Sequence, residues 1–256
     1  MEQLDYLIRT LNPNVKIPKS KQEKENLLRT LMNIWEVEKL PEQFFDVQDK
    51  YLKQKLSEKK IVELEELDEV ENNIYLWQGD ITTLKVDTIV NAANKVLLGC
   101  FVPHHRCIDN VIHTQAGLQL RQECFEIMQK QGEFEKTGQA KITSGYNLPA
   151  KHVIHTVGPI IYHSVEDSDK ELLASCYRSC LELALKNNLK SIAFCCISTG
   201  EFRFPNDLAA QIAVAEVRKV LSENPDRDIK VVFNVFKDSD LAIYRDILCY
   251  SEILGQ

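Results

Sequence analysis

Hydrophobic residues in the first part of the chain recur with the period of an amphipathic helix. One apolar stripe runs through residues 27–35 and a second through residues 44–56, and residues 1–70 contain no glycine. This pattern predicts a helical N-terminal extension over residues 1–70. The stripes look like the inward faces of packed helices, so we expect the extension to cover the surface of the following domain; a partner-binding module is the alternative. The charged segment 57–71 indicates a solvated helix end or a linker.

At Ile74 the pattern changes to short runs rich in valine, isoleucine and phenylalanine, which alternate with longer helical stretches. Such near-continuous apolar runs are typical of strands buried on both faces of a sheet. Strands are predicted over residues 74–77, 87–93, 141–148, 152–159, 191–198 and 231–236, and helices over residues 108–130, 170–187, 206–224 and 238–254. Strands that alternate with helices predict a three-layer α/β/α domain over residues 71–256.

Composition and charge are those of an ordinary globular protein. The 256 residues include 44% hydrophobic and 27% charged residues, and the formal net charge is −7. An acidic chain lacks the basic footprint of sequence-independent nucleic-acid binding, so we expect no nucleic-acid partner. No apolar run reaches the roughly 20 residues of a membrane span, and Glu2 and Asp5 stand where a signal peptide carries positive charge. We therefore expect a cytoplasmic protein without a membrane partner, whose eight cysteines are reduced.

The loops after the predicted strands carry the candidate chemistry, because ligands of open α/β sheets bind at the carboxyl ends of the strands. One such loop begins Ser198-Thr199-Gly200 and runs into a helix. Unpaired N–H groups at this turn and the dipole of the helix favour an anion. The loop could therefore hold a phosphate, with Phe202 or Phe204 stacking on a sugar or base.

Several further motifs occur in order along the chain. They are Gly79-Asp80-Ile81-Thr82, Ile-Val-Asn-Ala-Ala-Asn at 89–94, Ala116-Gly117, Thr137-Gly138, His-Thr-Val-Gly-Pro at 155–159, and Ser198-Thr199-Gly200 with Phe204-Pro205. Together they resemble the macrodomain family, the ADP-ribose-binding α/β/α modules. The resemblance covers residues from about 74 to 254 and implies a mixed central sheet.

The resemblance also implies roles for individual residues. Asp80 would accept a hydrogen bond from the adenine amino group, with Ile81 beside it through its backbone; the alternative for Asp80 is a helix or turn cap. Asn94 would bind the distal ribose, and Asn91 would support its loop. The pyrophosphate would lie against the segment that contains Ser198, Thr199, Gly200, Glu201, Phe202 and Phe204. Asn234 or Phe236 could flank the adenine ring, although a strand phenylalanine is more often part of the core.

The loop after Asn94 departs from the family pattern. Typical members are rich in glycine here, whereas this chain reads Gly-Cys-Phe-Val-Pro-His-His-Arg-Cys-Ile-Asp-Asn over residues 99–110. Thiolates and imidazoles this close together suit zinc; the alternative is two surface histidines and two incidental thiols. We expect Cys100, His105 and Cys107 to bind one Zn²⁺ ion, because residues 105 and 107 can face one ion in an extended turn. His104 follows Pro103 directly and would point away or orient a neighbour.

The Cys/His loop and the helical extension are similar to those of the zinc-containing macrodomain subfamily of bacteria and fungi. That resemblance implies a zinc-dependent hydrolase that removes single ADP-ribose groups from acidic side chains of proteins. It also implies a lipoylated carrier, resembling the glycine-cleavage H protein, as the modified substrate, and a sirtuin-type ADP-ribosyltransferase as functional partner. Asp109 is the candidate general base or water-orienting residue, with Asn94 beside it; an N-cap is the alternative for Asp109.

Two other functions would use the same pocket. A non-catalytic reader would bind ADP-ribosylated protein without releasing ADP-ribose, and a deacetylase would act on O-acetyl-ADP-ribose. Three protein ligands leave the fourth position of zinc open, as catalytic sites do, which favours the hydrolase. The sequence leaves open whether zinc takes part in catalysis or only shapes the loop.

Overall fold

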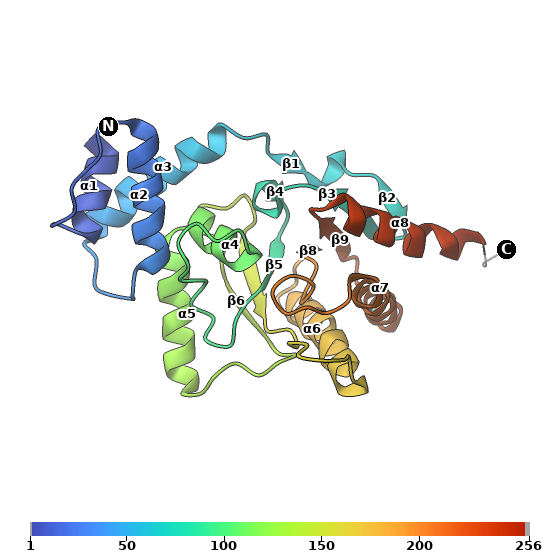
Figure 1. Ribbon diagram of the computed structural model, residues 1–256. Coiled ribbons are helices and arrows are strands. Elements are labelled where there is room, and N and C mark those ends of the chain that lie inside the picture. The colour runs from blue at the N-terminus through green and yellow to red at the C-terminus, as the bar shows by residue number, and fades with distance from the viewer. Residues whose placement is uncertain (1, 254–256) are drawn as a thin grey trace.

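The computed structural model describes residues 2–253, with side chains described for residues 2–248. Three helices form the N-terminal extension: α1 (Glu2–Leu11), α2 (Lys21–Ile34) and α3 (Glu42–Ser57). Their apolar faces pack around Phe44 into a core of their own, to which Leu118 of the following domain also belongs. Figure 1 shows these helices beside α4 and α5 at one end of the molecule. The extension therefore covers the surface of the domain, as the apolar stripes predict.

The charged segment after α3 is not a linker. It contains β1 (Val62–Glu63), the 3-10 turn η1 (Leu64–Glu66) and β2 (Glu69–Glu71). β1 pairs with β4 (Leu84–Lys85) in a small parallel sheet, and β2 pairs antiparallel with β3 (Ile74–Gln78). The sequence interpretation was wrong here because edge strands tolerate charged side chains, which hide the apolar alternation. β2 spans the proposed division between residues 70 and 71, and that division remains a prediction.

The main sheet has seven strands in the order β2-β3-β9-β8-β5-β7-β6. Its other strands are β5 (Thr88–Ala92), β6 (Ala140–Ser144), β7 (His152–Thr156), β8 (Ser191–Phe194) and β9 (Lys230–Val235). β3, β9, β8, β5 and β7 run parallel to one another, whereas the edge strands β2 and β6 are antiparallel to their neighbours. The sheet is thus mixed, as expected. Because the central strands are parallel, the loops that follow them meet at one edge of the sheet.

Helices cover both faces of this sheet. On one side lie α4 (Ile108–Ala116) and α5 (Leu118–Gln131), and on the other lie α6 (Asp167–Lys186) and α7 (Asn206–Glu223) (Figure 1). The last helix, α8 (Asp238–Ile253), packs against α7 and β3. This three-layer α/β/α arrangement confirms the predicted fold class.

Several predicted elements have different bounds in the structure. The helix predicted over residues 108–130 is two helices, because Gly117 adopts a φ of +99°, a conformation that favours glycine and ends α4. The strands predicted over residues 141–148 and 191–198 end at Ser144 and Phe194, where loops begin. Position 254, the predicted end of the last helix, lies outside the described residues.

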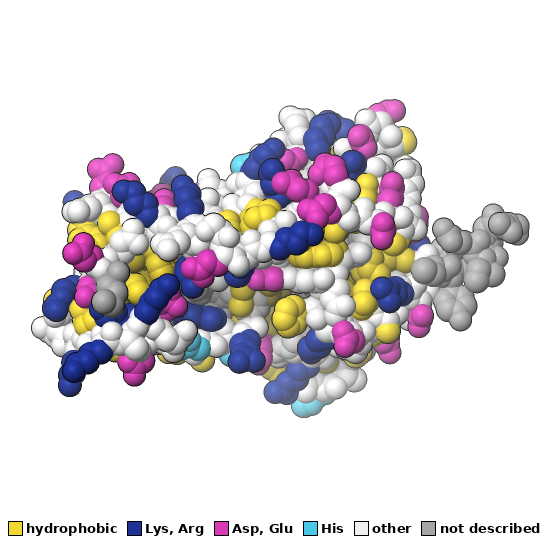
Figure 2. All heavy atoms as spheres, turned by 90° about the horizontal axis from the view of Figure 1, so that it is seen from above, with side chains coloured by type: hydrophobic (Ala, Val, Ile, Leu, Met, Phe, Trp, Pro, Cys, Tyr) yellow, Lys and Arg dark blue, Asp and Glu magenta, His cyan; other side chains and the backbone are white. Residues whose placement is uncertain are grey.

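Two surface properties bear on possible partners. Among residues 2–253, no helix combines the length and the apolar character that crossing a membrane requires. On the face shown in Figure 2, lysine and arginine side chains are interspersed with aspartate and glutamate instead of gathering into one basic surface.

Candidate active site

Two cysteines and one histidine come together in the loop between β5 and α4. The Sγ atoms of Cys100 and Cys107 and a ring nitrogen of His105 all lie within 4.8 Å of one another. His105 Nδ1 is 3.6 Å from Cys100 Sγ, and His105 Nε2 is 3.5 Å from a carboxylate oxygen of Glu201. His104 turns away from this group, toward α2. The histidine selected from the sequence is therefore the one that meets both cysteines.

The start of α4 orients the Cys107 sulfur. Cys107 is the N-cap of this helix, and its Sγ accepts a hydrogen bond from the Asn110 N–H at 3.4 Å. Burial and the nearby Cys100 raise the pKa of the Cys107 thiol to about 12. The thiol therefore ionises at neutral pH only when a positive charge, such as a metal ion, stabilises the thiolate. Because Cys107 occupies the N-cap, the alternative reading of Asp109 as the helix cap was wrong.

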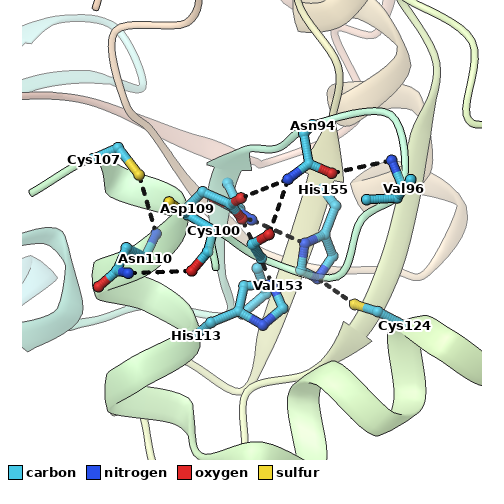
Figure 3. A network of polar contacts seen from close by, with 12 residues as sticks. Asn94, Val96, Cys100, Cys107, Asp109, Asn110, His113, Cys124, Val153 and His155 are labelled. Atoms are coloured by element: carbon cyan, nitrogen blue, oxygen red, sulfur yellow. Dashed lines mark hydrogen bonds and ion pairs between the residues drawn. The ribbon is translucent and has the colours of Figure 1, made fainter. Parts of the chain in front are cut away.

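Asp109 is the centre of a buried polar network next to this loop (Figure 3). Its Oδ1 accepts a hydrogen bond from Asn91 Nδ2 at 2.8 Å, and its Oδ2 accepts one from Asn94 Nδ2 at 3.2 Å. Asn94 also donates to Gly99 O, and its Oδ1 accepts from the Val96 N–H. Burial raises the pKa of Asp109 to about 6. The predicted pair Asn94 and Asp109 is thus in direct contact, whereas Asn91 is fully buried and faces Asp109 instead of solvent.

A second group of potential metal ligands is fully buried near Asp109 and consists of His113, Cys124 and His155. Both ring nitrogens of His155 are engaged, since Nδ1 lies 3.1 Å from the Asn91 amide nitrogen and Nε2 lies 3.0 Å from Thr143 Oγ1. Burial lowers the pKa of His155 to about 3, and it lowers the pKa of His113 well below its usual value. Both rings are therefore neutral, and the 3.6 Å approach of His113 Nε2 to Asp109 is not an ion pair.

The loop after β8 offers backbone groups to an anion. The N–H groups of Gly200, Glu201 and Phe202 have no hydrogen-bond partner within residues 2–253, and the loop leads to the N-terminus of α7. Unpaired N–H groups near a helix N-terminus favour a phosphate. A Cβ added at Gly200 would meet open space, so a ligand can approach the backbone there.

Several side chains of the same loop point inward. Ser198 has a φ of +65°, and its Oγ is buried against Gly158, where a Cβ would come within 2.0 Å of that oxygen. Thr199 Oγ1 donates to a carbonyl oxygen of its own loop. Phe204 is only 1% exposed and belongs to the core, whereas Phe202 is half-buried. Phe202 is therefore the aromatic ring that this loop can offer to a ligand.

Asp80 lies in the turn after β3, at the same edge of the sheet. It is the N-cap of the 3-10 turn η2 (Ile81–Thr83), so the cap expected as its alternative role is present. Its carboxylate accepts a hydrogen bond from the Thr82 N–H and pairs with Lys59 Nζ at 3.0 Å. Burial opposes ionisation, but the hydrogen bonds from the Thr82 hydroxyl and N–H groups, together with Lys59, hold the pKa of Asp80 below its usual value. The Ile81 side chain is buried, which leaves only its backbone for a ligand.

The end of β9 is hydrogen-bonded to the residues that lead into the Asp80 turn, since the Gly79 N–H donates to Val235 O. Phe236 is 76% exposed, and its carbonyl oxygen accepts a hydrogen bond from Gln78 on β3. Asn234 is buried and donates to Gly79 O, so its side chain holds the turn. An exposed ring and an ionised carboxylate at one edge of a sheet are the groups that can hold a purine by stacking and hydrogen bonding.

The sequence analysis did not predict four contacts of this site. They are the pair of Lys59 with Asp80, the contact of Glu201 with His105, and the hydrogen bonds from Asn110 to the carbonyl oxygens of Cys100 and Val102. Lys59 stands in a charged segment with no pattern that marks it. Glu201 belongs to the predicted pyrophosphate segment, but no local pattern predicts that it meets His105. The only sequence signal for Asn110 is its position as a polar residue near the start of a helix.

Known proteins resemble the chain over nearly its whole length. The Macro domain family matches residues 90–213. A protein-ADP-ribose hydrolase of Treponema medium is 50% identical over 252 residues, which cover 96% of each chain. A protein-ADP-ribose hydrolase of Staphylococcus aureus is 47% identical, with 95% of this chain and 94% of the relative covered. A probable bifunctional ADP-ribose hydrolase/ADP-ribosyltransferase of Fusarium oxysporum is 49% identical over 184 residues, which cover 68% of this chain and 31% of the relative.

Solved structures agree with these relatives. A macrodomain of Oceanobacillus iheyensis with ADP is 38% identical and has a TM-score of 0.65, with 73% of this chain and 96% of that chain covered. A Trypanosoma brucei macrodomain in complex with ADP-ribose is 34% identical with a TM-score of 0.65, covering 90% of this chain and 96% of that one. The sequence motifs, the mixed seven-stranded sheet and these matches agree, and the chain therefore belongs to the macrodomain family.

Proposed function

We propose that this macrodomain is a zinc-dependent hydrolase that releases ADP-ribose from acidic side chains of a modified protein. The observation that carries the proposal is the contact between the two loops, in which His105 of the Cys/His group meets Glu201 of the anion-binding loop. A metal at the first loop would then stand next to a phosphate bound at the second. Adenine would lie at Asp80 and Phe236, and the distal ribose at Asn94. The names of the full-length relatives support the same activity.

The Cys/His group suits zinc by its chemistry and its spacing. Its donor atoms lie within 4.8 Å of one another, so one ion can reach all three. His105 Nδ1 faces Cys100 and its Nε2 faces Glu201, and metal-binding histidines commonly donate their other ring N–H to a carboxylate. When bound at an open site, zinc polarises an oxygen ligand and lowers the pKa of bound water from 15.7 to about 7.

The chain's own side chains supply the remaining steps of the proposed reaction. Asn94 orients the distal ribose, since its Oδ1 accepts one hydrogen bond in the loop and has a second lone pair. Asp109, held by the Asn91 and Asn94 amides, takes a proton from the attacking water. The water hydroxyl adds to the anomeric carbon, and the acidic side chain of the substrate leaves as a carboxylate. Asn91 acts only by positioning Asp109.

The substrate protein and the transferase are proposed from the family resemblance. A lipoylated carrier similar to the glycine-cleavage H protein would be the modified substrate, and a sirtuin-type ADP-ribosyltransferase would modify it. The Fusarium relative supports a transferase partner, because its name joins a hydrolase and an ADP-ribosyltransferase in one chain. We place the reaction in the cytoplasm, where reducing conditions keep the cysteine ligands as thiols.

The test is release of ADP-ribose from a protein that carries single ADP-ribose groups on acidic side chains. The proposal expects catalytic release by the native chain. Binding without release would contradict it and favour a reader, whereas action on O-acetyl-ADP-ribose alone would favour the deacetylase.

Phe236→Ala is expected to weaken ADP-ribose binding about 10- to 100-fold, since stacking of a base on an aromatic ring contributes roughly 1–3 kcal/mol. Isothermal titration calorimetry with ADP-ribose measures the change. Tyr146→Ala is the matched control, because Tyr146 is a partly exposed aromatic residue that follows β6, at the opposite edge of the sheet. Equal affinities of the native chain and Phe236→Ala would place the adenine elsewhere.

A further inference from the structure

Helix α2 of the N-terminal extension lies directly against the Cys/His loop. Thr30 Oγ1 is 2.8 Å from His104 Nε2, and the His104 N–H donates to Asn33 Oδ1 at 3.0 Å. His104 immediately precedes His105, the histidine that meets the two cysteines. One face of α2 therefore holds the residue next to the candidate ligand by both its side chain and its backbone.

Asn33 is the buried centre of this contact. Both polar atoms of its side chain form hydrogen bonds. Oδ1 accepts a hydrogen bond from the His104 N–H, and Nδ2 donates one to Thr114 Oγ1 on α4 at 3.0 Å. The residue is only 2% exposed. His104 has a φ of +57°, a conformation that non-glycine residues keep when surrounding contacts hold them. The hydrogen bond from His104 to Asn33 is such a contact.

Arg29 extends the contact to the rest of the loop. Its Nη2 donates to Asn110 Oδ1 at 3.2 Å and approaches His105 O at 3.5 Å. Asn110 in turn donates through Nδ2 to the carbonyl oxygens of Cys100 and Val102. Helix α2 is thus connected to the Cys100 side of the loop as well as to the His105 side.

We propose that α2 is part of the metal centre, with Asn33, Thr30 and Arg29 as positioning residues that hold the Cys/His loop ready for zinc. The inference rests on the zinc site of the proposed function. A loop that already has the conformation of the bound state loses less conformational freedom when the ion binds, so its affinity is higher. The extension would then set zinc affinity in addition to covering the domain.

The test compares zinc affinity of the full-length chain and of Asn33→Ala by competition with a chromophoric chelator. We expect the affinity to fall about 10- to 100-fold, the range found when groups that orient metal ligands are removed. Thr30→Val, which keeps the side-chain shape but removes the hydroxyl group, should show a smaller loss. Circular dichroism checks that each variant is folded at the assay temperature.

Gln48→Ala is the matched control. Gln48 is fully buried on α3 and accepts a hydrogen bond from the Leu118 N–H, so its loss loosens the extension at another point without touching the Cys/His loop. Its zinc affinity should equal that of the native chain. An unchanged affinity in Asn33→Ala, or an equal loss in Gln48→Ala, would overturn the inference and leave the zinc site standing. If Asn33→Ala does not fold, the zinc affinity of Thr30→Val is compared with those of the native chain and Gln48→Ala, and an unchanged affinity would overturn the inference.

Zinc binding by the native chain and by Cys100→Ala tests the zinc site itself. If the native chain binds no zinc, or if Cys100→Ala binds zinc as tightly as the native chain, the zinc site itself is wrong and the inference fails with it. A native chain that binds zinc and releases ADP-ribose, beside an Asn33→Ala variant of native affinity, contradicts the inference alone.

Discussion

Cys100→Ala is expected to lose its bound zinc and to release ADP-ribose at least about 100-fold more slowly than the native chain. Loss of a group that only hydrogen-bonds a metal ligand already lowers metal affinity or activity about 10- to 100-fold, and loss of a ligand should cost more. The reason is that Cys100 Sγ supplies one of only three donor atoms in the loop and lies 3.6 Å from His105 Nδ1. Zinc content by atomic absorption and release from a protein modified on acidic side chains are measured on the same samples. Native protein stripped by a chelator should behave like the variant.

Cys124→Ala is the control for the position of the metal. Cys124 belongs to the second, fully buried group with His113 and His155, in which both nitrogens of His155 are already engaged. This variant should keep its zinc and its activity. Loss of zinc in Cys124→Ala but not in Cys100→Ala would place the metal in the buried group. If the stripped protein released ADP-ribose as fast as the native protein, zinc would serve only to stabilise the loop.

Asp109→Asn is expected to lower kcat by about 10²- to 10⁴-fold, the range for removal of a general base. Asparagine has nearly the same shape and can still accept a hydrogen bond from Asn91 or Asn94, but it cannot take a proton from water. KM should change less than kcat, because Asp109 touches Asn94 but not the residues proposed to hold the adenine and the pyrophosphate. Steady-state release assays at several substrate concentrations separate the two constants.

Asp87→Asn provides the comparison for Asp109→Asn. Asp87 precedes β5 at the far edge of the sheet, where its carboxylate pairs with Lys151 at 2.7 Å and accepts from the Lys190 N–H. Its replacement should lower the free energy of unfolding and leave kcat unchanged. If Asp109→Asn raised KM without lowering kcat, Asp109 would serve only to hold Asn94, and another group would activate the water.

The residues that could be predicted from the sequence are those whose relations are local. Cys100, His105 and Cys107 stand within one short loop, so their spacing alone brings them together. Asn94 and Asp109 flank the same loop and meet across it. The alternation of strands and helices likewise predicts the three-layer domain, because the period of apolar residues reports which faces are buried.

Other features were not visible in such local patterns. Gly117 divides a continuous helical pattern because its φ of +99° ends α4 there. The strand β2 is hidden in a charged segment, since an edge strand is only partly buried. Phe204 and Phe202 look equivalent in the sequence, yet the first is in the core and the second faces the loop surface.

The sequence by itself determined the fold class and the order of the motifs, because apolar periodicity and motif order can be read directly along the chain. It also determined the grouping of Cys100, His105 and Cys107, because these residues stand within one short loop. Only the tertiary structure decided that Glu201 meets His105 and that α2 supports the loop. The contacts from Arg29 to His105 and Asn110 span 76 and 81 residues. Contacts over such separations depend on how whole helices and strands pack, which local periodicity does not specify.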